Sequence, residues 1–159
     1  FNQVLPSMFK KINGKNKLSI IHQSGEKMFE LLKESYEGAD FKVETRKYIF
    51  DMEKKYNWAD IVIARSGALT VSELITSGSA SILIPYPFAV DDHQFFNAKI
   101  LKDAGAAEIV REKDLEEKLV LHLVKLDRKK CENMALKAKE LHSYDACAEV
   151  LKVCNTLLK

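Results

Sequence analysis

Residues 61–73 read IVIARSGALTVSE, and they contain the parts from which the architecture can be worked out. The apolar run at 61–64 predicts a buried strand, Gly67 marks a short turn, and the amphipathic segment after it predicts a helix. The first turn of a helix has backbone N–H groups without internal partners, and the helix dipole adds partial positive charge. With the cation of Arg65 beside it, this turn predicts a site for a phosphate-bearing ligand. The carboxylate of Glu73 is placed to accept hydrogen bonds from sugar hydroxyls.

The alternation of strand and helix extends over most of the chain. Apolar runs bounded by turn residues predict strands at 18–22, 41–43, 60–64, 81–84 and 108–110. Helical spacing predicts helices at 1–12, 26–36, 51–56, 70–77 and 93–104, and then from residue 114 onward with breaks near Arg128 and Ser143-Tyr144. This order predicts parallel βαβ units, so the expected fold class is α/β, a Rossmann-like doubly wound parallel sheet with helices on both faces. Ligands of such sheets bind beyond the carboxyl ends of the strands.

The composition is that of an ordinary globular protein. The chain has 159 residues, of which 47% are hydrophobic and 30% charged, enough for one domain with a sizeable core. Its 25 basic and 23 acidic residues give a formal charge of +2, so no nucleic-acid partner is expected. Light clusters of lysines near both ends are expected to be solvated faces, with a weak attraction to anionic lipid as the alternative.

Other classes of protein are not indicated. The chain has no apolar run of transmembrane length and no signal-peptide pattern. Its cysteines, Cys131, Cys147 and Cys154, lack the spacing of metal ligands, and their odd number fits a reducing cytosol. Because the sequence begins at Phe1 within a helical pattern, we expect it to be a piece of a longer protein.

Two interpretations of the turn at 67–73 stay open from the residues alone. Thr70 and Glu73 have the spacing of a capping box, in which a hydroxyl and a carboxylate satisfy helix-end donors reciprocally. The position of the turn at the end of a strand, next to Arg65, favours the ligand site equally.

A second polar cluster follows the strand at 81–84, in the sequence PYPFAVDDHQ at 85–94. Asp91 and Asp92 precede a helix, where acidic residues are typical caps and dipole partners. The paired carboxylates also suit a divalent cation, but nothing nearby completes a coordination shell, so no metal is expected. The amide of Gln94 both donates and accepts, which suits sugar hydroxyls.

Among three further residues, His22 has both a structural and a functional interpretation, Trp58 a structural one and Ile49 a functional one. His22 ends a strand, where a histidine is usually structural although a catalytic base is the alternative. Trp58 is expected to belong to the core. Ile49 lies in an apolar run ahead of a short helix, which could hold a flat base through backbone groups and the isoleucine side chain.

Several ordered motifs resemble the MurG family, bacterial N-acetylglucosaminyltransferases that act on undecaprenyl-pyrophosphoryl-N-acetylmuramoyl-pentapeptide (lipid I). These motifs are HQSG at 22–25, the segment 49–60, SGALTVSE at 66–73, IP at 84–85, DDHQ at 91–94, NA at 97–98 and AGAA at 104–107. The resemblance implies a GT-B glycosyltransferase of the family 28 type, with an active site between two Rossmann-like domains. Residues 1–159 then correspond to a single C-terminal domain that binds UDP-GlcNAc, without its first strand and glycine-rich loop and without the N-terminal acceptor domain.

The resemblance also implies roles for individual residues. Ile49 is expected to contact uracil, the backbone of 68–70 to hold the diphosphate, Glu73 to bind the ribose and Gln94 the GlcNAc ring. The implied donor-binding set is Ile49, Ala68, Leu69, Thr70, Val71, Ser72, Glu73 and Gln94, with Arg65, Gly67 and His93 as secondary candidates. No catalytic residue, cofactor or metal ligand is expected in this chain.

The implied reaction is an inverting transfer of GlcNAc from UDP-GlcNAc to the 4-hydroxyl of MurNAc in lipid I, which gives lipid II for peptidoglycan synthesis. It takes place at the cytoplasmic face of the bacterial inner membrane. The lipid I pocket, the base and the peripheral contact with anionic membrane are expected in the missing N-terminal domain, so the piece itself is expected to be soluble and inactive. The alternatives are a glycolipid synthase that uses UDP-galactose, a UDP-GlcNAc 2-epimerase, or a separate non-catalytic donor-binding subunit completed by a partner chain.

Overall fold

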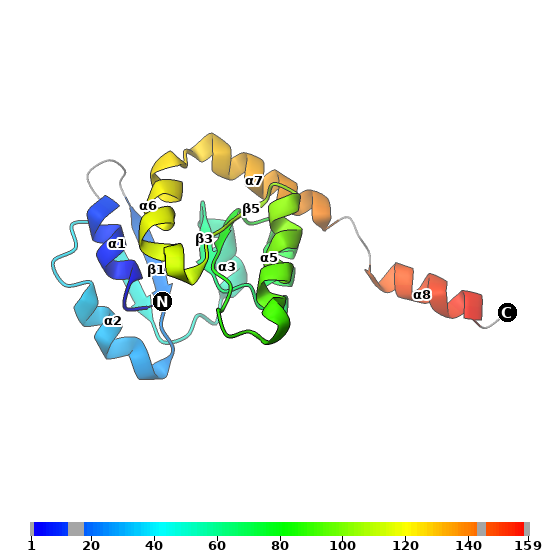
Figure 1. Cartoon of the computed structure of the whole chain (residues 1–159), viewed down its shortest axis with the longest axis horizontal. Coiled ribbons are helices and arrows are strands. Elements are labelled where there is room, and N and C mark those ends of the chain that lie inside the picture. Colours follow the sequence, from blue (N-terminus) through cyan, green and yellow to red (C-terminus); the bar gives the residue numbers. More distant parts are fainter. Residues whose placement is uncertain (1, 13–17, 143–145, 158–159) are drawn as a thin grey trace. The chain divides into compact units, whose positions relative to one another are not determined.

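The computed structural model describes residues 2–12, 18–142 and 146–157. The chain divides into two compact units, and each is described by itself. The first unit comprises Phe1–Lys55 and Val110–Asp127, and the second comprises Tyr56–Ile109 and Arg128–Lys159. Figure 1 labels several elements of each unit.

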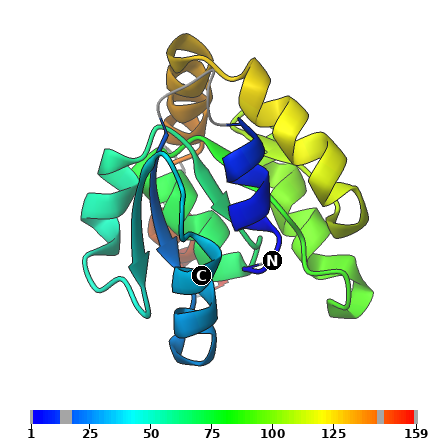
Figure 2. The same cartoon turned by 90° about the vertical axis from the view of Figure 1, so that its left-hand side faces the viewer.

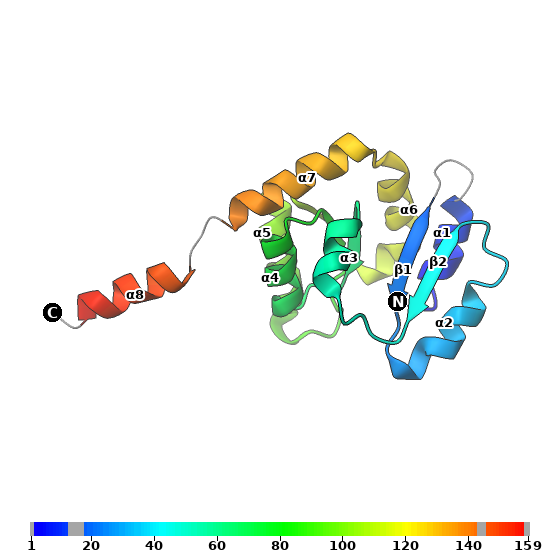
Figure 3. The same ribbon diagram turned by 180° about the vertical axis from the view of Figure 1, so that it is seen from behind.

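The first unit contains a two-stranded parallel sheet with helices packed beside it. The strands pair in register from Ser19 opposite Lys42 to Gln23 opposite Arg46, and Figure 3 shows them side by side with α2 next to β2. Helix α1 packs against α6, as the blue and yellow helices of Figure 2 show. The elements are α1 (Leu5–Ile12), β1 (Ser19–Gln23), the 3-10 helix η1 (Glu26–Met28), α2 (Phe29–Ser35), β2 (Lys42–Arg46), η3 (Glu112–Asp114) and α6 (Leu115–Lys125), with α3 (Met52–Trp58) continuing into the second unit.

The second unit contains a three-stranded parallel sheet in the order β3-β4-β5. Val62 lies opposite Ser81, and Ser81 lies opposite Ala107. Because neighbouring strands are consecutive and parallel, α4 and α5 are the crossover helices of two successive βαβ units. The elements are β3 (Val62–Ala64), α4 (Ala68–Ser77), β4 (Ser81–Leu83), η2 (Val90–Asp92), α5 (His93–Asp103), β5 (Ala107–Ile109), α7 (Arg128–Leu141) and α8 (Ala146–Leu157).

The core of the second unit lies between the central strand and its helices. All of β4 is buried, as expected of a parallel strand covered on both faces. The cluster around Leu83 includes Leu74 of α4 and Leu101 of α5, and Ala138 of α7 completes it. Gly78 ends α4 in the left-handed conformation, with φ 64°, which glycine adopts without a steric penalty.

The parallel α/β alternation predicted from the sequence is confirmed. In the described residues the strands hydrogen-bond in two sheets, one in each unit. The predicted helix at 26–36 is divided between η1 and α2, and the break near Arg128 separates α6 from α7. The break near Ser143-Tyr144 lies outside the described residues.

Two further expectations meet different outcomes. The prediction that Trp58 belongs to the core is wrong, because its side chain is 51% exposed at the end of α3. Among the described helices, none combines the length and the apolar character needed to cross a bilayer.

Candidate functional site

The turn between β3 and α4 presents an open helix N-terminus. Gly67 is the N-cap, in extended backbone, and it brings no side-chain cap to the helix. The first intrahelical hydrogen bond runs from Val71 N–H to Gly67 O at 3.0 Å, so the N–H groups of 68–70 have no intrahelical acceptor. Ala68 and Leu69 are exposed, which leaves this end of α4 accessible to an anion.

The capping box proposed for Thr70 and Glu73 is wrong. Because α4 begins at Ala68, Thr70 lies within the first helical turn and is not the N-cap residue. The Glu73 carboxylate instead accepts a hydrogen bond from the hydroxyl of Tyr56, at 2.8 Å from O to Oε2. The Glu73 side chain is exposed on the surface of α4.

The other predicted residues of α4 differ in their exposure. Ser72 is exposed on the helix surface. Val71 has its side chain in the core at 5% exposure, and its N–H is bonded to Gly67. Ser72 therefore faces solvent, whereas Val71 fixes the turn to the core.

Arg65 lies where β3 and β4 end. Its Nη1 donates to the carbonyl oxygens of Ile84 and Pro85, each at 3.2 Å. Its guanidinium carbon also lies 5.5 Å from the centre of the Tyr86 ring, in cation–π range. The cation is thereby held at the carboxyl edge of the sheet, where parallel α/β folds bind their ligands.

The loop after β4 is tied to the turn after β3. The buried Ser66 donates its hydroxyl proton to the backbone oxygen of Gln94 at 2.7 Å, and Asn97 Nδ2 donates to Ser66 O at 3.2 Å. The side-chain oxygen of Gln94 accepts from the N–H of Tyr86 at 2.9 Å. This hydrogen bond to the oxygen fixes the orientation of the Gln94 carboxamide. Its NH₂ group is a donor that suits an acceptor oxygen of a sugar.

Asp91 and Asp92 direct the chain into α5 through their backbone. Both adopt left-handed conformations, with φ of 49° and 52°, which are uncommon outside glycine. Asp92 is the N-cap of α5 but makes no side-chain capping bond, so the expectation that it caps the helix by its side chain is wrong. His93 Nδ1 donates to Val90 O at 2.8 Å. Within the described residues no group of acidic, His and Cys side chains is arranged to hold a metal ion.

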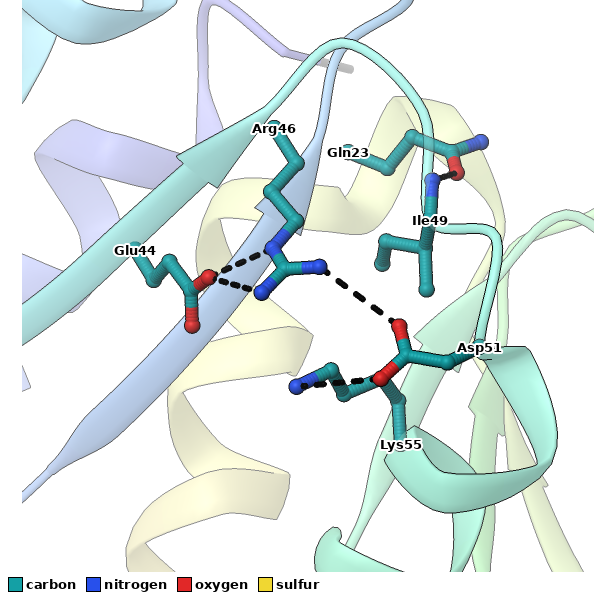
Figure 4. A network of polar contacts seen from close by, with 6 residues as sticks. All are labelled: Gln23, Glu44, Arg46, Ile49, Asp51 and Lys55. Atoms are coloured by element: carbon teal, nitrogen blue, oxygen red, sulfur yellow. Dashed lines mark hydrogen bonds and ion pairs between the residues drawn. The ribbon is translucent and has the colours of Figure 1, made fainter.

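In the first unit, Ile49 lies in a loop that is braced on both sides (Figure 4). Its N–H donates to Gln23 Oε1 at 2.8 Å. Arg46 pairs with Glu44 and reaches Asp51 at 3.5 Å, and Lys55 lies 3.8 Å from the same aspartate. The sequence predicted a base held through backbone groups of Ile49. Since Gln23 already occupies this N–H, a base reaches it only by replacing the amide oxygen.

His22 has the structural role that a strand-end histidine usually has. The side chain is buried between Tyr36 OH, 2.9 Å from Nδ1, and Asn2 Oδ1, 3.2 Å from Nε2. An amide oxygen only accepts, so Nε2 carries the proton and Nδ1 accepts from the phenol. Burial lowers the pKa of His22 to about 4 and raises the pKa of Tyr36. The imidazole is neutral and engaged at both nitrogens, which argues against a catalytic base.

The sequence did not reveal that Tyr56 and Gln23 are hydrogen-bond partners of candidate residues. Tyr56 lies 17 positions before Glu73, and Gln23 lies 26 positions before Ile49. No local pattern links residues at such separations. The available signals were that Gln23 directly follows a predicted strand and that Gln23 and Tyr56 lie in segments that resemble the family.

Comparison with known proteins places the chain in a family. Residues 1–150 match the model of the glycosyltransferase family 28 C-terminal domain. A relative from Shewanella halifaxensis, named UDP-N-acetylglucosamine–N-acetylmuramyl-(pentapeptide) pyrophosphoryl-undecaprenol N-acetylglucosamine transferase, is 41% identical over 159 residues, 97% of this chain and 44% of its own length. A relative of the same name from Dechloromonas aromatica is 37% identical and aligns with 99% of this chain and 45% of its own length.

One solved structure agrees with the sequence relatives. The crystal structure of MurG from Acinetobacter baumannii superposes with a TM-score of 0.81 at 37% identity, over 87% of this chain and 41% of that one. The chain thus spans less than half the length of the curated relatives it matches. Its fold is the α/β, Rossmann-like fold of GT-B glycosyltransferases. The chain therefore belongs to the family of C-terminal domains of glycosyltransferase family 28.

Proposed function

We propose that residues 1–159 form the donor-binding domain of an inverting N-acetylglucosaminyltransferase. The whole enzyme transfers GlcNAc from UDP-GlcNAc to the 4-hydroxyl of MurNAc in lipid I and gives lipid II for peptidoglycan synthesis. The relatives' names support the donor, the acceptor and the group that is transferred. The observation in this chain that supports it best is the exposed N-terminus of α4 after Gly67, which suits a diphosphate.

The donor is proposed to lie along the carboxyl edge of the second unit's sheet. The N–H groups of Ala68, Leu69 and Thr70 and the positive end of the α4 dipole hold the diphosphate, with Arg65 as a nearby cation. One oxygen of Glu73 is bonded to Tyr56, and the carboxylate keeps acceptor capacity for the ribose hydroxyls. The NH₂ group of Gln94 donates to a hydroxyl of the GlcNAc ring.

Ile49 is proposed to contact a uracil base. An N–H that donates to an amide oxygen also suits a carbonyl oxygen of the base, because the two acceptors are chemically alike. The aliphatic side chain of Ile49, half-buried in the loop, offers a flat base an apolar surface.

In the proposed reaction the 4-hydroxyl oxygen attacks the anomeric carbon and the bond from that carbon to the diphosphate oxygen breaks. UDP leaves with the bonding electrons, and the hydroxyl proton passes to a base. The α4 N-terminus stabilises the negative charge that develops on the departing UDP. We assign the base, the lipid I pocket and a peripheral contact with the cytoplasmic face of the inner membrane to the remaining portion of a longer protein.

The proposal is tested with the full-length enzyme, UDP-GlcNAc and a soluble lipid I analogue. We expect formation of the disaccharide product, and calorimetry is expected to show tighter binding of UDP-GlcNAc than of UDP-galactose. Preferred binding of UDP-galactose would identify a glycolipid synthase. Conversion of UDP-GlcNAc without an acceptor would identify a 2-epimerase, and donor binding that needs a second chain for turnover would identify a separate subunit.

A further inference from the structure

We propose that Tyr56 is a positioning residue for the ribose of the nucleotide and acts through the Glu73 carboxylate. This inference rests on the proposed function, since it assigns a second residue to the same donor site. It starts from the contact between the Tyr56 hydroxyl and Glu73 Oε2, at 2.8 Å. Both residues belong to the second unit.

The two partners differ in how firmly they are held. The Tyr56 ring is partly buried against the core cluster that contains Val71 and Leu74 of α4. Glu73 is exposed on α4 and has three rotatable side-chain bonds, so its carboxylate has many accessible orientations unless something fixes it. A hydrogen bond from a packed ring selects one orientation before the nucleotide arrives, and preorganisation of this kind lowers the entropic cost of binding.

The direction of the hydrogen bond also suits a diol ligand. A phenol that donates leaves the carboxylate as an acceptor, and an ionised carboxylate has about four acceptor positions on its two oxygens. One is used by Tyr56, and the others remain for the two ribose hydroxyls, which are donors. Burial, together with the hydrogen bond to Glu73, raises the pKa of Tyr56, so the phenol keeps its proton at neutral pH.

Packing alone does not explain a tyrosine at this position. The other residues in contact with this core are aliphatic, with Val62, Ile75 and Ile109 among those only partly buried. A phenylalanine would supply the same apolar ring. The hydroxyl is the one atom that distinguishes the two, and its partner is Glu73.

The test is a double-mutant cycle of Tyr56 and Glu73 in the full-length enzyme, in which calorimetry measures the affinity for the donor. Tyr56→Phe is expected to weaken UDP-GlcNAc about fivefold, the order expected for loss of one hydrogen bond. The same substitution is expected to change nothing for a UDP-GlcNAc analogue whose ribose lacks both hydroxyls, and nothing further in a Glu73→Ala background. In steady-state kinetics KM rises about as much while kcat is retained, because a contact made equally in ground and transition states is lost.

The matched control is Tyr36→Phe, which removes a buried hydroxyl that is bonded to His22 in the first unit. It is expected to lower stability and to leave donor affinity unchanged. An equal loss of affinity for the ribose-modified analogue in Tyr56→Phe would overturn the proposal, as would lower stability with unchanged donor affinity. A wild-type enzyme that binds both ligands equally would also overturn it, whereas a wild-type enzyme that binds no UDP-GlcNAc would refute the proposed function itself.

Discussion

The loops that follow β2 and β3 differ in how their backbone N–H groups are paired. Each leaves a parallel strand and leads to a helix, and each carries candidate ligand residues. After β2, the N–H of Ile49 is bonded to Gln23, and ion pairs of Arg46 and Asp51 brace the loop. After β3, Gly67 brings no capping side chain, and Ala68 and Leu69 at the start of α4 are exposed.

This comparison separates hydrogen-bond donors that are paired within the protein from donors that are accessible to a ligand. A donor already paired within the protein contributes to stability, and a ligand gains little from it unless it replaces the existing partner. An exposed helix N-terminus keeps donors and positive potential for an anion. Perturbing the loop after β3 should therefore reduce binding, while perturbing paired groups of the first unit should mainly change stability.

The largest effect is expected at Glu73. In the full-length enzyme, Glu73→Ala should weaken UDP-GlcNAc roughly 10- to 100-fold, because hydrogen bonds to a charged acceptor are worth about 1.5–3 kcal/mol. Glu53→Ala removes an exposed glutamate of α3 and is the control, with no expected loss. Calorimetric titration measures both. Unchanged donor affinity in Glu73→Ala would mean that the carboxylate is not part of the binding region.

His22, which is hydrogen-bonded at both ring nitrogens, should make the stability of the protein depend on pH. Its pKa is near 4 in the folded protein, where burial disfavours the charged form, and near 6.5 when unfolded. Above pH 6.5 both states are neutral and the stability is complete. As the pH falls from 6.5 towards 4, only the unfolded state takes up the proton, so the free energy of unfolding declines by about 2 kcal/mol between pH 7 and 5.

Urea unfolding of the 159-residue chain at pH 7 and pH 5 measures this decline. His22→Gln keeps a polar side chain but cannot titrate, so this variant should show a smaller difference between the two pH values. An identical difference in the variant and the wild type would assign the acid sensitivity to other groups.

A proline at the start of α4 tests directly whether the N–H groups of its first turn bind phosphate. Ala68→Pro removes one N–H at the first helical position, where proline is tolerated, and the φ of −60° and ψ of 152° at Gly67 suit a residue before proline. UDP affinity should fall about tenfold, the loss of one hydrogen bond to a charged phosphate. Uridine, which has no phosphate, should bind the variant and the wild type alike, and an equal loss for both ligands would contradict a role in diphosphate binding.

The smallest effect is expected at Gln23, and its sign is informative. If the base replaces the amide oxygen, Gln23→Ala removes the competitor for the Ile49 N–H and should strengthen UDP binding about threefold. Gln23→Glu supplies a stronger, charged acceptor and should weaken it. Competition binding with a fluorescent uridine nucleotide compares the two. Weaker binding by Gln23→Ala would show that the side chain supports the loop and does not compete with the base.

The sequence alone determined the features that arise from neighbouring residues. The βαβ alternation, the turn at Gly67 and the end of α4 at Gly78 were all predictable, because hydrophobic periodicity and the glycine requirement of a left-handed residue are local properties. The phosphate site expected at this turn also follows from the position of the turn after an apolar strand, whereas the roles of the individual residues on α4 were implied by the family resemblance.

Only the tertiary structure decided which groups are paired. Thr70 and Glu73 have capping-box spacing, but the helix begins two residues earlier and Glu73 pairs with Tyr56. Ser66 meets Gln94 across 28 positions of sequence. Such contacts depend on strand register and on how helices pack against a sheet, which place distant residues side by side, and short-range spacing carries no information about either.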